Sequence, residues 1–255
     1  MNKKDALFKY LLRLGDDRLV LGHRISEWCG HAPVLEEDIA LANISLDLIG
    51  QAESFLNLAG QIEGKGRSED DLAYLRDDNE FCNLQLLEQP RGDFADTIAR
   101  LFLFNTFDYL FLKELSKSTN AELSALAAKA EKESRYHFRH SSEWLLRLGD
   151  GTKESHKRIQ ESLNKYQEFA DEMFVMDEID KILLEDGSVP DLSLIQPVWQ
   201  KTVDSLLERA TLNPLHHVST TAKRTLGRAG IHTAHLKEML SVMQILPRTY
   251  PNAKW

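Results

Sequence analysis

Apolar residues recur at three- and four-residue spacing along nearly the whole chain, and this periodicity restricts the fold more than any other feature of the sequence. Such spacing places apolar side chains on one face of an α-helix, whereas a half-buried strand needs apolar and polar residues in alternation. Almost no stretch alternates for long enough to predict a strand. The sequence therefore predicts an all-α protein.

Glycine, proline and polar clusters divide this pattern into helices. The first two helices are predicted over about 4–28 and 35–62, and Gly64-Lys65-Gly66 ends the second. The segment 67–93 is polar and rich in turn residues. We expect two short helices in it, near 68–75 and 79–87. Further helices are predicted over about 94–117, 120–148, 154–176, 192–210 and 233–246, with an acidic segment around Pro190 and a polar loop over 211–230 between the later ones.

The long connection over 67–93 lies between two pairs of long predicted helices. Ferritin-like bundles need one long crossover between their two helical hairpins. The pattern therefore predicts a ferritin-like four-helix bundle with a long crossover and additional C-terminal helices. With 255 residues and 42% hydrophobic content, the chain can bury one large core. We expect a single domain over 1–255, with the core bundle at about 4–148 and a C-terminal helical extension at about 154–255.

Bundles of this kind can bind two iron ions through one carboxylate from each of two helices and a Glu-x-x-His pair from each of the other two. The second predicted helix carries Asp47, but Gly50 stands three residues later. The fourth carries Glu133, but Tyr136 stands three residues later and His137 comes one residue too late. No Glu-x-x-His pair occurs anywhere in the sequence. We therefore predict a degenerate di-iron site, with no catalytic, cofactor or metal role, at Asp47, Gly50, Asp108, Glu133, Tyr136 and His137.

A histidine four residues after its glutamate is rotated by only about 40° beyond a full helical turn, so the angle alone leaves His137 within reach. Gly50 supplies no ligand at all, and it is the stronger argument against a metal. A hydrogen bond to a neighbouring helix is the alternative interpretation for Asp47, Glu133 and His137, because buried polar side chains usually have such bonds. Other candidates for inward-facing polar residues are His23, Glu27, Asn43, Asn105 and His140.

A second group of histidines lies on the polar loop and at the start of the last helix. A closed metal site there needs carboxylate or thiolate partners, and this segment supplies only Glu238. We expect solvated side chains rather than metal ligands for His216, His217, His232 and His235.

The formal net charge of −9 argues against binding to nucleic acid or anionic lipid, since both need basic patches. No apolar stretch approaches the ~20 residues of a membrane span. The N-terminus lacks the apolar core and cleavage site of a signal peptide. Two cysteines, Cys29 and Cys82, are too few for a disulfide framework. These features predict a cytosolic protein with reduced thiols and with neither nucleic acid nor a membrane as partner.

Five stretches resemble one known family: LVLGHRISEWCGHAPVLEEDIALANISLDLIGQAESFL, LLEQPRGDFADTIARLFLFN, KESRYHFRHSSEWLLRLGDGT, DEID and GIHTAHLKEML. They are similar to the PaaC family, the structural subunits of bacterial phenylacetyl-CoA epoxidase, a multicomponent oxygenase that epoxidises an aromatic ring. The similarity extends over nearly the whole chain in register. The SEWCGHAP block and the EQPRGDFADTIAR block are its most specific parts.

The resemblance implies a ferritin-like subunit that pairs with a homologous catalytic subunit, PaaA, and stabilises it. In the family PaaA holds the di-iron centre and the CoA substrate, and a reductase with flavin and an iron–sulfur cluster supplies electrons from NADPH. The resemblance therefore implies no cofactor in this chain and no activity when it is alone. The reductase is a second candidate partner, and a homodimer is a candidate state of the isolated chain.

Two other functions stay open. One is an autonomous di-iron monooxygenase or ferroxidase, which requires ligands that the sequence does not supply. The other is a stand-alone helical adaptor protein that uses its acidic surface for recognition. The full-length resemblance favours the structural subunit over both.

Overall fold

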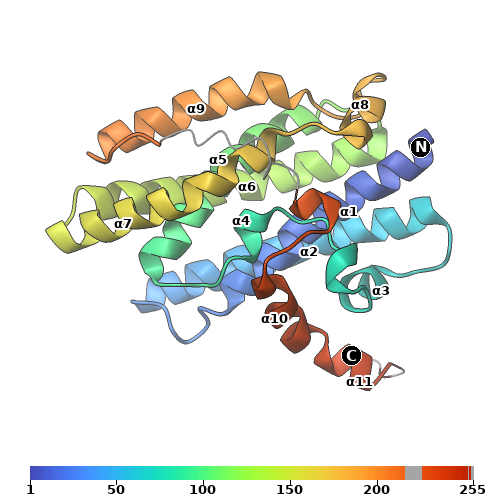
Figure 1. Cartoon of the computed structure of the whole chain (residues 1–255), viewed down its shortest axis with the longest axis horizontal. Helices are drawn as coiled ribbons and strands as arrows, with labels where there is room; N and C mark the ends of the chain where they lie inside the picture. The colour runs from blue at the N-terminus through green and yellow to red at the C-terminus, as the bar shows by residue number, and fades with distance from the viewer. Residues whose placement is uncertain (216–225, 252, 254–255) are drawn as a thin grey trace. The chain divides into compact units, whose positions relative to one another are not determined.

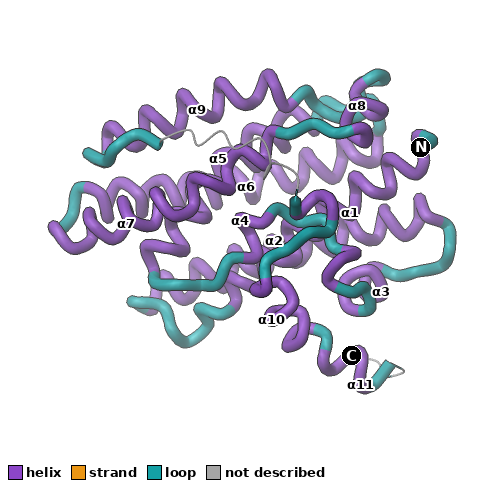
Figure 2. Tube along the Cα trace, in the orientation of Figure 1, coloured by secondary structure: helices purple, strands orange, loops and turns teal. Residues whose placement is uncertain are grey.

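The computed structural model describes residues 1–215, 226–251 and 253 of the chain. Within these residues every regular element is a helix, as Figures 1 and 2 show, and the all-α prediction is confirmed. The chain divides into two compact units, the first made of Met1–Pro90 and Thr225–Trp255 and the second of Arg91–Arg224. The boundary expected near residue 150 lies inside the second unit, and the single domain stays a prediction.

The first unit is built on a long antiparallel helix pair, α1 and α2. The hydroxyl of Ser45 donates to the carbonyl of Gly22 at 2.7 Å, and Lys4 at the start of α1 reaches the carbonyl of Glu63 at the end of α2. Shorter helices from the crossover and from the C-terminal part of the chain complete the unit. Its helices are α1 (Lys3–Ser26), α2 (Leu35–Glu63), α3 (Glu69–Tyr74), η1 (Asp78–Glu80), α4 (Gln85–Glu88), η3 (Gly227–Ala229), α10 (Ala234–Met243) and α11 (Ile245–Thr249).

Two glycines bring α1 and α2 close together. A Cβ atom added at Gly15 would lie 2.5 Å from Cδ2 of Leu56, and one added at Gly22 would lie 3.0 Å from Cγ1 of Ile49. Any larger residue at Gly15 would push the two helices apart or displace Leu56. The glycines of α1 therefore serve close helix packing.

The second unit is built on another long antiparallel pair, α5 and α6. Near one end the rings of Phe94 and Trp144 meet edge to face at 4.9 Å. The α9 helix packs on α5, where the indole nitrogen of Trp199 donates to the carbonyl of Leu103 at 3.1 Å. The helices of this unit are α5 (Phe94–Leu115), α6 (Ala121–Gly149), α7 (Lys153–Tyr166), η2 (Gln167–Phe174), α8 (Glu178–Leu184) and α9 (Leu192–Arg209).

Most predicted helices occur within a few residues of their expected bounds, and three regions differ. The helix expected over 154–176 keeps α geometry only to Tyr166 and continues as a 3₁₀ helix. The helix expected near 79–87 is two short pieces. In the acidic segment α8 was not predicted, although Asp177 and Asp180 form a capping box at its start. Part of the loop expected over 211–230 lies outside the described residues.

Candidate functional site

Two of the predicted site residues lie in one buried polar cluster between α5 and α6. The carboxylate of Asp108, only 2% exposed, accepts a hydrogen bond from the hydroxyl of Ser134 at 2.9 Å. One turn away, the amide of Asn105 donates to the carbonyl of His137 at 3.2 Å. Ser134 was not predicted from the sequence, where a small hydroxyl on an apolar face gave only a weak signal. The cluster joins the two helices through a carboxylate, a hydroxyl and an amide.

The other two predicted site residues on α6, Glu133 and Tyr136, are less deeply buried. Glu133 is half-buried, and Tyr136 is 39% exposed. The guanidinium of Arg139 lies over the Tyr136 ring, 5.6 Å from its centroid. Tyr136, which stands where a histidine ligand belongs, therefore contacts a surface arginine.

On α2, the predicted positions Asp47 and Gly50 are both half-buried. A Cβ atom added at Gly50 would meet no heavy atom within 4 Å among the described residues. Two other candidates for inward-facing residues were wrong. Glu27 is exposed at the C-cap of α1 and pairs with Arg24 at 2.7 Å, and Asn43 is exposed on the solvent side of α2.

The residues at these positions do not fit a di-iron centre. Gly50 offers no donor atom, Tyr136 lies at the surface, and one oxygen of Asp108 already accepts the Ser134 hydroxyl. Within the described residues no group of three or more His, Cys, Asp and Glu side chains is placed to hold a metal ion. No chemical step through iron can be assigned to this chain, and the absence of a catalytic, cofactor or metal role stays a prediction.

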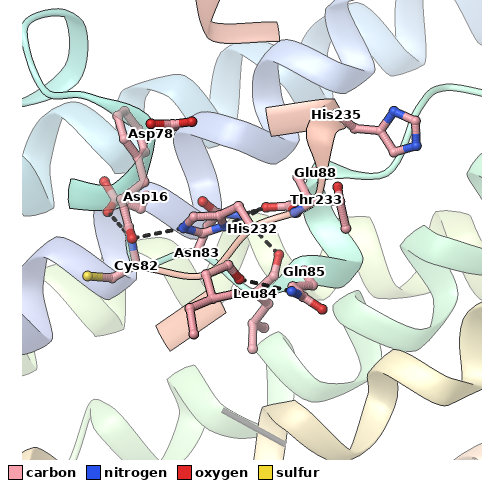
Figure 3. A network of polar contacts seen from close by, with 12 residues as sticks. Asp16, Asp78, Cys82, Asn83, Leu84, Gln85, Glu88, His232, Thr233 and His235 are labelled. Atoms are coloured by element: carbon pink, nitrogen blue, oxygen red, sulfur yellow. Dashed lines mark hydrogen bonds and ion pairs between the residues drawn. The ribbon is translucent and has the colours of Figure 1, made fainter. Parts of the chain in front are cut away.

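A polar network in the first unit surrounds Glu88, whose carboxylate is fully buried (Figure 3). Its Oε2 atom accepts from Nδ1 of His232 at 2.7 Å and from the amide of Asn83 at 3.0 Å. Its Oε1 atom accepts the backbone N–H of Thr233 at 2.6 Å. The other ring nitrogen of His232 lies 2.9 Å from the carbonyl of Phe81. Glu88 thus ties α4 to the segment that leads into α10.

Both ring nitrogens of His232 face acceptors, so the ring satisfies both contacts only when it carries two protons. Burial alone would lower the pKa of His232. Its hydrogen bonds to Glu88 and to the Phe81 carbonyl, together with the charge of Glu88, outweigh burial and raise the pKa above its ordinary value. The geometry and the pKa both indicate a charged histidine bound to a buried carboxylate.

Two further ion pairs, each with a buried carboxylate on α1, hold neighbouring segments to that helix. The guanidinium of Arg76 binds the carboxylate of Asp16, with Nη1 3.1 Å from Oδ2. Arg228 binds Asp17 at 2.8 Å and also donates to the carbonyl of Cys82. Because Arg76 belongs to the crossover and Arg228 to the C-terminal segment, the pairs fasten both segments to α1.

The predicted histidine group is only partly described. His235 has a 40% exposed side chain 3.4 Å from Glu238, which agrees with the expected solvated state. The expectation was wrong for His232, whose side chain is 4% exposed, because its partner Glu88 lies outside the local sequence. His216 and His217 lie outside the described residues.

Cys29 and Cys82 are both free cysteines. None of the helices in the described parts of the chain combines the length and the apolar character that a membrane crossing requires.

Two long antiparallel helix pairs, a long crossover between them and added C-terminal helices define an all-α protein of the ferritin-like class, as predicted. The family described as "Phenylacetic acid catabolic protein", PaaA_PaaC, matches residues 1–255. The chain is also 47% identical over 251 residues to a subunit of 1,2-phenylacetyl-CoA epoxidase from Escherichia coli (strain K12), covering 98% of this chain and 100% of that protein. The chain therefore belongs to the phenylacetic acid catabolic protein family, and the resemblance noted in the sequence is confirmed.

Proposed function

We propose that this chain is the structural, non-catalytic subunit of a phenylacetyl-CoA epoxidase in aerobic phenylacetate catabolism. In this role it pairs with the catalytic subunit PaaA and stabilises it. The observation that carries the proposal is the 47% identity, over 98% of this chain and 100% of the relative, to a protein whose name makes it a subunit of that enzyme. A match that covers both chains almost completely favours a shared place in the same assembly over an adaptor role.

The residues at the degenerate site support the division of labour between the subunits. Gly50 and Tyr136 stand where the two histidine ligands of a ferritin-like di-iron centre belong. Asp108 instead forms part of the contact between α5 and α6. In this proposal the di-iron centre belongs to PaaA and the flavin and iron–sulfur cluster to the reductase. This chain supplies packing surface in the cytoplasm, without a nucleic acid or membrane partner.

The test is the iron content of the chain purified alone and of the chain co-expressed with PaaA, both from iron-supplemented cells. We expect iron near zero in the isolated chain and about two irons per pair. Epoxidation of phenylacetyl-CoA by PaaA, reductase and NADPH should require this chain, as measured by product formation with and without it.

Other outcomes would overturn the proposal. About two irons in the isolated chain would support an autonomous di-iron oxygenase. Failure to co-purify with PaaA would support a stand-alone adaptor. Asp108→Asn serves as a second probe, since a structural role for Asp108 predicts that the assembled complex retains turnover.

A further inference from the structure

An unpartnered apolar stripe runs along the first half of α2. Leu35, Ile39 and Leu46 are 72%, 54% and 66% exposed, far more than side chains of this kind in the core. Ala42 lies between them on the same face and is half-buried. The intervals of four, three and four residues are those of the a and d positions of a heptad, by which one helix packs along another. We call Leu35, Ile39, Ala42, Leu46 and Gly50 the α2 stripe.

Gly50 continues the stripe, four residues after Leu46. The glycines of α1 are required because Leu56 and Ile49 lie against them, but a Cβ atom at Gly50 would meet nothing within 4 Å in the described residues. Glycine inside a helix costs about 0.5–1 kcal/mol relative to alanine. Packing within the chain does not account for this cost. A second helix seated against Ala42, Leu46 and Gly50 accounts for it, because two small residues on either side of a leucine let the helix axes approach closely.

The charge of α2 indicates which kind of partner helix would fit against the α2 stripe. Its sequence, LEEDIALANISLDLIGQAESFLNLAGQIE, contains no Lys, Arg or His. Of its six acidic residues, Glu36 and Glu53 are exposed and Asp38 and Asp47 are half-buried, whereas Glu37 is buried and Glu63 pairs with Arg67. A second copy of the same helix would bring like charges together, which opposes association. A helix whose apolar face is flanked by Lys or Arg would complement both the stripe and its charge.

We propose that the α2 stripe is the docking surface for one amphipathic helix of PaaA, with basic residues flanking its apolar face. The inference rests on the proposed function, which supplies the partner. From Leu35 to Gly50 the stripe extends over about 22 Å, long enough for four turns of a partner helix. Gly50 then has a role at the interface, in addition to lacking the donor atom of a metal ligand.

The experiment compares variants for binding to purified PaaA by isothermal titration calorimetry at low and high salt. Leu46→Asp places a charge in the centre of the stripe, and Gly50→Leu fills the space reserved for the partner. Both substitutions have room in the isolated chain, so neither should lower its melting temperature by much, and Gly50→Leu should raise it slightly because leucine favours the helix more than glycine does. We expect each variant to raise the Kd at least tenfold, and wild-type binding to weaken as salt rises. Leu194→Asp on α9, where Leu194 is 70% exposed, is the matched control and should bind as wild type does.

Each contrary outcome has a defined meaning. Wild-type affinity in Leu46→Asp and Gly50→Leu, with normal epoxidation, would overturn the docking surface and leave the proposed function standing. Loss of binding only in Leu194→Asp would place the interface on α9 and overturn the inference. Self-association of the isolated chain that Leu46→Asp abolishes, with PaaA binding intact, would show that a second copy covers the stripe. Wild-type protein that does not bind PaaA would overturn the proposed function and this inference with it.

Discussion

Nδ1 of His232 lies 2.7 Å from Oε2 of Glu88, although 144 residues separate the two along the chain. The carbonyl of Phe81 can only accept, so the second ring nitrogen carries a proton. Because Nδ1 also donates to the Glu88 carboxylate, the ring is positively charged, and the contact is a charged hydrogen bond inside the first unit. The contact therefore ties α4, in the crossover, to the segment that leads into α10.

Stability should depend on pH through His232. Its pKa is raised above the ordinary 6.5 in the folded protein, so its contribution to stability is complete below pH 6.5. The contribution should fall as pH rises through the raised pKa. His232→Gln should remove this decline, as measured by the difference in urea-unfolding free energy between variant and wild type from about pH 6 to pH 9. His235→Gln, at an exposed histidine of the same segment, should keep the wild-type profile. An unchanged profile in His232→Gln would contradict the assignment.

The buried hydroxyls of α6 should respond in opposite directions. Ser134→Ala removes the donor to the buried carboxylate of Asp108 and should destabilise the protein by about 1–2 kcal/mol. The Ser142 hydroxyl is also buried, and it has no hydrogen-bond partner among the described residues. Ser142→Ala should therefore be neutral or slightly stabilising. Urea denaturation of both variants measures the difference, and equal destabilisation would refute the structural account of Ser134.

Two glycines of α2 provide a second matched pair. Gly50→Ala should stabilise the isolated chain by about 0.5–1 kcal/mol, since its added methyl group has open space and alanine favours the helix. Gly60→Ala should destabilise the chain, because its Cβ atom would collide with the backbone carbonyl of Arg67. Thermal unfolding distinguishes the two. A loss of stability in Gly50→Ala would mean that this side of α2 is covered within the chain.

The ion pair of Asp16 and Arg76 should matter far more than an exposed one. Arg76→Met leaves the buried carboxylate of Asp16 without its cation and should cost about 3–5 kcal/mol. Lys117→Met breaks an exposed pair with Glu114 and should leave the free energy of unfolding nearly unchanged. A double variant with Asp16→Leu should recover part of the loss, because it removes the stranded charge. Without that recovery, the loss in Arg76→Met would have to come from the packing of the arginine side chain.

The helices of the core were predictable because their signals are local. The second predicted helix, 35–62, matches α2 at Leu35–Glu63, where apolar periodicity ends at Gly64 with a left-handed φ of 75°. The side of a helix that faces the core was harder to predict. Glu27 and Asn43 were expected to face inward and are exposed, since a helical pattern with apolar residues on two faces does not fix the orientation of the helix.

Long-range charge pairing could not be predicted from one sequence. Asp17 and Arg228 are 211 residues apart, and local periodicity carries no information about which distant charge compensates a buried one. His232 was therefore assigned to its neighbours in the sequence. By contrast, the prediction of a degenerate site at Gly50 and Tyr136 needs only local information, because the spacing rule for its ligands lies within a single helix turn.

The buried carboxylates Asp17 and Glu88 are synthesised long before the side chains that pair with them. Their cations follow much later in the chain: Arg228 comes 211 residues after Asp17, and His232 comes 144 residues after Glu88. At roughly 5–20 residues per second, a nascent chain carries Glu88 without its cation for about 7–30 s and Asp17 for about 11–42 s. A polypeptide that terminates before Arg228 never acquires them. Synthesis of the segment that carries Arg228 and His232 is thus a condition for closing the first unit, and chains that end before it should be substrates for chaperones and proteases.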